Sequence, residues 1–264
     1  MYNFKYHKVN TIQEAVSLLS SCEDPKILAG GHTLIPTLKQ RLSQPSDIID
    51  ISTIKDLSSI SIQNNKLMIG ALCTHNDVSS SPDVISTIDG LSELAKKIGD
   101  PQVRHRGTIG GSVANADPAA DYPAALVALK AVIHTSKSTY QAEKFFIDMF
   151  QTAIETDEII RGIEFEIPIT SSYKKFKNPA SGYAMAGVFI AKFDNDIRVA
   201  VTGASSVVFR LREVEEALTN KFNISSIENI SIDSSNFNDD IHASSKYRGN
   251  LVKVLVEEAI SDLI

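Results

Sequence analysis

The fold of this chain is decided by the stretch ILAGGHTLIP at residues 27–36, where an apolar run meets two glycines and then a helical pattern. The apolar residues are typical of a strand end, and Gly30 and Gly31 allow the backbone to turn tightly and approach a ligand. Because Pro36 is tolerated only in the first turn of a helix, we expect a helix to begin at Leu34. Free N–H groups at such a turn favour a phosphate or pyrophosphate. A plain strand-to-helix turn explains the same residues, and the motif alone does not choose.

Around this turn the sequence predicts a compact β-α-β-α-β unit. Strands are expected at residues 4–9, 26–29 and 47–50, with helices at 11–20 and 34–42 between them. The glycines are followed by no Gly-Lys-Ser/Thr, and they do not form a Gly-x-Gly-x-x-Gly fingerprint. The P-loop and the Rossmann dinucleotide motif are therefore excluded.

The pattern changes after this unit. The sequence predicts a hairpin at 60–70, helices at 85–98 and 124–130, a strand at 131–135, a hairpin reaching residue 144 and a strand at 158–167. A proline and a polar cluster at 167–172 predict a domain boundary. Beyond it the sequence predicts a strand at 196–202, helices at 211–219 and 247–263, and a polar surface loop at 220–240.

A second glycine-rich stretch, RHRGTIGGSVANADPAAD, occupies residues 104–121. Its density of small and polar residues predicts neither a helix nor a strand interior. Such residues let a ligand lie directly on the backbone, and Thr108, Ser112 and Asn115 offer hydrogen-bonding groups.

Two aspartates end this stretch. Asp117 and Asp121 each precede a proline-containing helix start, so each is a candidate N-cap. Asp121 is also a candidate ligand-binding carboxylate. A paired acid/base or a magnesium site would use the same two residues, although no third acidic or histidine neighbour lies in the motif.

Bulk composition excludes several classes of function. The 264 residues carry a net charge of −6 without a basic block, which argues against nucleic acid as the main partner. The longest apolar runs are shorter than the roughly 20 residues of a membrane span, and the N-terminus has no signal-peptide core. We therefore expect a soluble, cytoplasmic protein. Cys22 and Cys73 are expected to be small buried or half-buried hydrophobes, because two distant cysteines support neither a disulfide framework nor an iron–sulfur or zinc site.

The two glycine-rich stretches together carry a resemblance. AGGHT at 29–33 and TIGGS at 108–112, running on to ADPAAD at 116–121, strongly resemble the paired FAD-binding motifs of the medium, flavin-carrying subunit of the molybdenum hydroxylases. That family includes carbon monoxide dehydrogenase, xanthine dehydrogenase and aldehyde oxidoreductases. The resemblance covers essentially the whole chain, including the segment from Tyr173 to Gly187. Thr33 stands where the family often has Ser, and Ser112 where it often has Asn.

The resemblance implies an α+β fold. It consists of a two-subdomain FAD-binding domain of the vanillyl-alcohol-oxidase (PCMH) type at 1–168, with subdomains at about 1–52 and 53–168, and a smaller α+β C-terminal domain at 169–264. It also implies no catalytic or metal-binding residue in this chain.

The implied cofactor contacts fall on both motifs. Backbone groups of the first motif would cradle the pyrophosphate, the second motif would line the other side of FAD, and Asp121 would accept from a ribityl hydroxyl. Tyr183 is a candidate for a ring contact, and Lys175 or Lys177 for the flavin edge, with at least one of the two lysines expected to be a solvated surface residue. The implied residues are Ala29, Gly30, Gly31, His32, Thr33, Thr108, Ile109, Gly110, Gly111, Ser112, Asn115, Asp121, Lys175 and Tyr183.

Two histidines lie in or beside these motifs. His32 could be a metal ligand or a general base, but no second His or Cys lies at ligand spacing, so a structural or backbone role is favoured. His105, between two arginines, could face a partner or the cofactor, and the sequence does not decide.

The resemblance implies a subunit that passes electrons from iron–sulfur clusters to an external acceptor. Molybdopterin-type molybdenum cofactor and two-iron two-sulfur clusters would lie on a large and a small partner subunit, in a heterotrimer or a dimer of heterotrimers. The substrate would be an aldehyde such as glyceraldehyde. Two alternatives are a stand-alone flavin oxidoreductase of the same fold, such as the peptidoglycan-precursor reductase type, and a non-enzymatic nucleotide-binding module.

Overall fold

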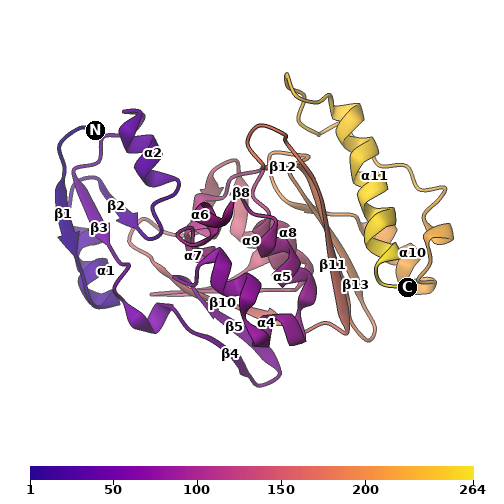
Figure 1. Ribbon diagram of the computed structural model, residues 1–264, viewed down its shortest axis with the longest axis horizontal. Coiled ribbons are helices and arrows are strands. Elements are labelled where there is room, and N and C mark those ends of the chain that lie inside the picture. The colour runs from indigo at the N-terminus through magenta and orange to yellow at the C-terminus, as the bar shows by residue number, and fades with distance from the viewer.

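The N-terminal unit surrounds the first glycine motif. In the computed structural model, which describes residues 1–264, strands β1 (Lys5–Lys8), β3 (Asp47–Asp50) and β2 (Pro25–Leu28) form a parallel sheet in that order. Helices α1 (Ile12–Ser21) and α2 (Leu34–Lys39) connect them (Figure 1). Thr11 caps α1 by accepting the N–H of Glu14. The predicted β-α-β-α-β unit is confirmed.

The middle unit is built on an antiparallel sheet of five strands in the order β4-β5-β10-β6-β7. The hairpin of β4 and β5 turns at Asn64 and Asn65, both with positive φ, as a type I′ turn requires. A small hairpin, β8 and β9, lies outside this sheet. The strands are β4 (Ile60–Gln63), β5 (Lys66–Gly70), β6 (Val132–Thr135), β7 (Thr139–Gln141), β8 (Phe146–Asp148), β9 (Gln151–Thr152) and β10 (Ile160–Glu166).

Seven short helices complete the middle unit. They are α3 (His75–Ser80), α4 (Pro82–Thr87), α5 (Asp89–Lys96), α6 (Pro101–Arg104), α7 (Ile109–Asn115), α8 (Tyr122–Ala128) and α9 (Ala142–Phe145). The single helix predicted at 85–98 is wrong, because Ile88 adopts a non-helical backbone that separates α4 from α5.

The prediction of no helix in the second glycine-rich stretch is also wrong, since α7 lies there. Gly110 is needed for packing rather than flexibility, because a Cβ on it would lie 2.6 Å from the Cβ of Ala71.

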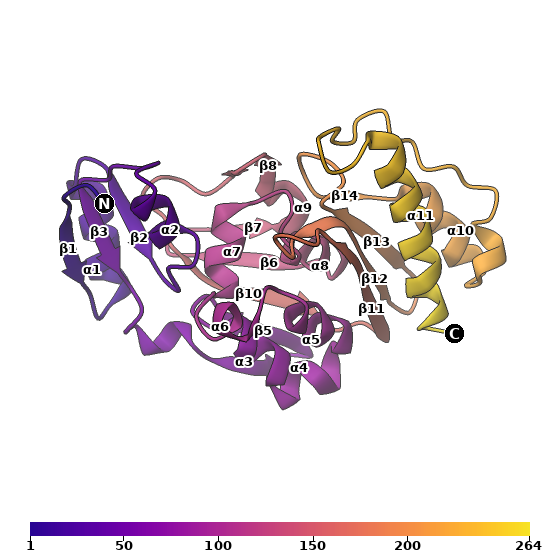
Figure 2. The same ribbon diagram turned by 45° about the horizontal axis from the view of Figure 1, so that its top comes forward.

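The C-terminal unit is a four-stranded antiparallel sheet with helices on one face. Strands β11 (Thr170–Lys177), β12 (Ala184–Lys192), β13 (Ile197–Thr202) and β14 (Phe209–Arg210) pair in chain order. Helices α10 (Arg212–Asn220) and α11 (Ser245–Ser261) cover one face, and α8 and α5 of the middle unit pack on the other (Figure 2). Residues 221–244 carry only a short 3-10 turn, in agreement with the predicted loop.

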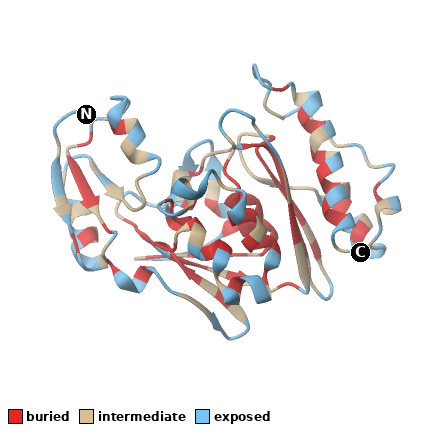
Figure 3. Cartoon of the chain, viewed as in Figure 1, coloured by how far each residue is buried: buried red, intermediate tan, exposed pale blue.

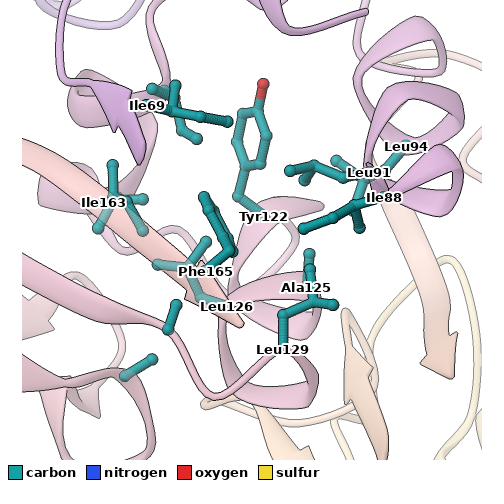
Figure 4. Packing of buried hydrophobic residues seen from close by; sticks show 14 of the residues in the cluster. Ile69, Ile88, Leu91, Leu94, Tyr122, Ala125, Leu126, Leu129, Ile163 and Phe165 are labelled. Carbon is teal, nitrogen blue, oxygen red and sulfur yellow. The ribbon is translucent and has the colours of Figure 1, made fainter. Parts of the chain in front are cut away.

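The largest hydrophobic core lies between the middle and C-terminal units (Figure 3). Helix α8 is buried along its whole length, and Tyr122 and Leu126 contribute to the cluster that includes Ile69 and Ile163 of the sheet and Leu91 of α5 (Figure 4). The N-terminal unit has a much smaller core. None of the helices combines the length and apolar content needed to cross a bilayer.

Candidate functional site

The two glycine motifs meet in the structure. The loop after β2 lies against the turn between α6 and α7 (Figures 1 and 2). A Cβ added to Gly30 would collide with the carbonyl oxygen of Arg106 and would lie 3.0 Å from the Cα of Gly107. Gly30 is therefore required for this backbone contact, and the predicted pairing of the two motifs has a direct geometric basis.

The first motif presents unpaired backbone donors. None of the N–H groups of residues 29–33 donates to a protein acceptor, whereas the carbonyls of Gly31 and Thr33 accept from Ile35 and Thr37. Gly31 has a φ of 78°, a conformation that L-residues rarely adopt. Consecutive free N–H groups in a turn form an anion-binding concavity. This donor set fits a pyrophosphate.

Helix α2 contributes little to the binding of an anion at this loop. It is six residues long, and the side chain of its N-cap, Thr33, makes no capping bond. The Thr33 hydroxyl and the exposed His32 thus remain available beside the loop. We attribute the anion preference to the loop N–H groups rather than to a helix dipole.

The second motif uses its donors internally. The N–H groups of Ile109 and Gly110 donate to the carbonyls of Cys73 and Ala71, and Thr108 Oγ1 accepts the N–H of Gly111 at 3.1 Å. The Ile109 side chain is fully buried. The N–H groups of Ile109 and Gly110 therefore hold this turn in place and are not free to donate to a ligand.

Other groups of the second motif are accessible. Gly111 is exposed and Ser112 and Asn115 are half-buried, one turn apart on α7. The side chains of Ser112 and Asn115 make no hydrogen bond within the protein, so they remain free to bind a ligand.

Asp121 does not cap α8. Its side chain accepts no helix N–H, so the N-cap interpretation is wrong for this residue. Its buried carboxylate accepts a hydrogen bond from the Tyr173 hydroxyl at 2.5 Å and pairs with Lys175 Nζ at 2.9 Å. Burial raises the pKa of Asp121, and Lys175 and Tyr173 act against that rise.

The N-cap interpretation is also wrong for Asp117, since Pro118 lies in a turn and α8 begins only at Tyr122. Asp117 accepts the N–H of Ala119 at 2.9 Å and so closes the turn before α8. Burial raises its pKa. The one set of three metal-ligating side chains in close proximity is His7, Cys22 and Asp47 in the N-terminal unit. The magnesium interpretation of Asp117 and Asp121 therefore has no support, nor has a metal-ligand role of His32.

The two candidate lysines are placed differently. The Lys175 side chain is only 2% exposed and lies in the ion pair with Asp121, whereas Lys177 is exposed at the end of β11. Tyr183, in the turn between β11 and β12, is 45% exposed. Burial and then the charges of Asp117 and Asp121 raise the pKa of Tyr183.

Sequence analysis missed His75 and Tyr173. His75 is buried, its N–H donates to the carbonyl of Gly107, and its Nδ1 lies 3.2 Å from the Tyr122 hydroxyl. Burial lowers the pKa of His75 to about 4, and the nearby charges of His32 and Arg104 add to this effect. No local sequence pattern marks either residue as functional. His75 is the first residue of a helix that Thr74 caps, and Tyr173 is one of several residues in a strand. His105 is exposed at the end of α6.

Comparison with known proteins places this geometry in a family. Residues 2–169 match the family model described as the FAD binding domain in molybdopterin dehydrogenase. The chain is 35% identical to the glyceraldehyde dehydrogenase medium chain of Sulfolobus acidocaldarius over 98% of both chains. It is 37% identical to the carbon monoxide dehydrogenase medium chain of Hydrogenophaga pseudoflava over 78% of this chain and 77% of that one.

Solved structures agree. A carbon monoxide dehydrogenase structure from Hydrogenophaga pseudoflava matches with a TM-score of 0.90 and 33% identity over 98% of this chain and 96% of that chain. Quinoline 2-oxidoreductase from Pseudomonas putida matches with a TM-score of 0.89 and 25% identity over 98% and 96%. The predicted resemblance, fold class and FAD cofactor are confirmed. This chain belongs to the FAD-binding medium subunits of the molybdenum hydroxylase family.

Proposed function

We propose that this chain holds FAD as the electron-transfer subunit of a molybdenum-dependent dehydrogenase complex. The observation that carries the proposal is the contact of the two glycine motifs at Gly30 and Arg106, with free backbone donors at residues 29–33. When bound, FAD supplies reversible one- and two-electron redox chemistry. The residues of this chain bind it, orient it and limit its access to water.

Accessible groups supply most of the proposed contacts, whereas Thr108 and Asp121 are buried residues of the second motif. Backbone N–H groups of Ala29, Gly30, Gly31, His32 and Thr33 hold the pyrophosphate, and the Thr33 hydroxyl adds a donor. Thr108, Gly111, Ser112 and Asn115 line the second side. The Asp121 carboxylate already accepts hydrogen bonds from Tyr173 and Lys175, and its remaining lone pairs accept from a ribityl hydroxyl. Tyr183 contacts the ring system.

The partners are proposed from the relatives. Several are named as medium chains or subunits, among them a nicotine 6-hydroxylase medium subunit of Paenarthrobacter nicotinovorans. We propose a large molybdenum-cofactor subunit and a small iron–sulfur subunit, in a cytoplasmic heterotrimer. The named relatives differ in substrate while sharing this subunit type, so the substrate is decided on the large subunit. An aldehyde such as glyceraldehyde is proposed from the relative that combines 35% identity with 98% coverage of both chains.

The test is an absorption spectrum of the purified full chain, followed by co-purification from its native source. We expect flavin bands near ~370 and ~450 nm that shift when the protein unfolds, and co-purification with two further subunits. A chain without flavin bands contradicts the cofactor assignment and favours a nucleotide-binding module. A lone monomer with full substrate-dependent activity contradicts the complex and favours a stand-alone flavin oxidoreductase.

A further inference from the structure

A buried ion pair joins the C-terminal sheet to the start of α8. Asp121 lies at the α8 start and Lys175 on β11, with Nζ 2.9 and 3.0 Å from the two carboxylate oxygens. The side chains are 5% and 2% exposed. Tyr173, two residues earlier on the same face of β11, donates its hydroxyl to the same carboxylate.

Lys97 adds a third element to this cluster. Its carbonyl, at the end of α5, accepts from Lys175 Nζ at 3.2 Å, and its own ammonium donates to the Tyr173 carbonyl at 3.0 Å. The Lys97 ammonium also lies 5.7 Å from the centre of the Tyr173 ring. Every polar atom at the centre of the cluster therefore has a partner drawn from α5, α8 or β11.

Stability alone does not explain such an arrangement. Burying a carboxylate and an ammonium costs desolvation energy that their attraction often fails to exceed, so a hydrophobic replacement is frequently neutral or stabilising. A fully bonded buried pair does fix one relative geometry of the elements that carry it. The geometry fixed here is that of the β11–β12 hairpin against the second glycine motif.

The same hairpin carries Tyr183 at its tip. The Asn178 N–H donates to the Tyr183 carbonyl at 2.7 Å, and the Ala184 N–H donates to the carbonyl of Ala119 at 3.2 Å. The tip is thus held beside the loop between Asp117 and Asp121. Any displacement of β11 relative to α8 would move Tyr183 relative to this loop.

We propose that Asp121, Tyr173 and Lys175, here called the hairpin clasp, form a positioning device that holds Tyr183 against the FAD site. The inference rests on the proposed function and deepens it, because it assigns Lys175 and Tyr173 to positioning and not to contact with the flavin edge. Lys175 acts through Asp121 and the hairpin.

A double-mutant cycle on the FAD-loaded full chain tests the clasp. Tyr183→Ala is made in wild type, in Lys175→Met and in Lys174→Met, and FAD dissociation constants and visible circular dichroism of the flavin are measured. Lys174 is the matched control, since it lies next on β11 but forms a surface pair with Asp262. We expect Tyr183→Ala to weaken FAD about fivefold in wild type and Lys174→Met, and less than about 1.5-fold in Lys175→Met.

Two further variants keep the test decisive. Asp121→Asn with Lys175→Met removes both charges, so no lone carboxylate is buried, and Lys175→Arg should partly restore the wild-type dichroism. An equal effect of Tyr183→Ala in folded Lys175→Met and wild type would overturn the clasp. If Lys175→Met and the Asp121→Asn, Lys175→Met double variant both unfold, the proposal is also overturned, because the cluster would then serve stability and not positioning. A wild-type chain without flavin contradicts the proposed function instead.

Discussion

The two glycine motifs look alike in sequence but differ in hydrogen bonding. The first leaves the N–H groups of residues 29–33 free, whereas the second commits those of Ile109, Gly110 and Gly111 to Cys73, Ala71 and Thr108. We therefore propose that the first motif is the binding surface and the second a frame that carries the half-buried side chains of Ser112 and Asn115. Gly30 allows the two motifs to approach each other, and Gly110 allows α7 to pack on Ala71.

Substitution at the contact between the two motifs should have the largest effect on FAD binding. We expect Gly30→Ala to weaken FAD binding by at least about 100-fold, because its Cβ would collide with a backbone carbonyl that cannot rotate away. Gly111→Ala is the comparison variant in the second motif, where the new Cβ would meet only the Thr108 side-chain oxygen, at 2.9 Å, so we expect a smaller loss. Flavin content after gel filtration measures both, and equal losses would remove the distinction between surface and frame.

Gly31→Val is a poorer test than Gly30→Ala. A Cβ on Gly31 would lie 2.7 Å from Ile35 Cδ1 and would force a branched residue into a positive φ. Loss of flavin in that variant would report a distorted loop as readily as an occupied ligand space.

Acidification should lower the free energy of unfolding by protonating the buried His75, which lies beside the second motif. The folded pKa of His75 is about 4 against 6.5 unfolded, so the unfolded chain binds the extra proton first. The stabilisation that neutral His75 gives the folded state is fully present above pH 6.5. The free energy of unfolding falls by about 3 kcal/mol as the pH falls to 4. Urea unfolding at several pH values should show a shallower loss between pH 6.5 and 4 in His75→Gln than in wild type. Parallel curves would contradict a buried neutral His75 beneath Gly107.

Replacing the threonines that precede α7 and α2, Thr108 and Thr33, should affect different properties. Thr108→Val removes a capping acceptor and should lower the free energy of unfolding by about 1 kcal/mol. Thr33→Val removes no such bond, so stability should stay within about 0.5 kcal/mol of wild type while FAD binding weakens. Urea midpoints and FAD titrations separate the effects. A stability loss at Thr33 equal to that at Thr108 would contradict the comparison.

Sequence predicted the elements whose signals are local. The β-α-β-α-β unit, the Asn64-Asn65 hairpin and the long C-terminal helix depend on periodicity and turn chemistry within short windows, and all are present. Helix α7 was missed because its two glycines, Ser112 and Val113 have weak helix propensity, which the packing of Gly110 against Ala71 overrides.

The candidate site was predictable only in part. The motif resemblance identified the family, and the backbone donors at Gly30 and Gly31 follow from the turn itself. The partners of Asp121 could not be predicted, since Tyr173 and Lys175 lie more than 50 residues away and meet it only through the packing of β11 on α8. The burial of His75 likewise depends on the tertiary fold.

The order in which the chain is synthesised has a consequence for cofactor loading. The N-terminal sheet needs only residues up to Asp50, so its glycine loop can form early on the ribosome. The middle sheet waits for β10, whose Ile163 pairs with Ile69, and the frame around Ala120 waits for Thr202, which bonds its carbonyl. Such long-range pairings form late. Stable capture of FAD is therefore a late event in biogenesis, and a chain truncated before β13 would expose half a binding site.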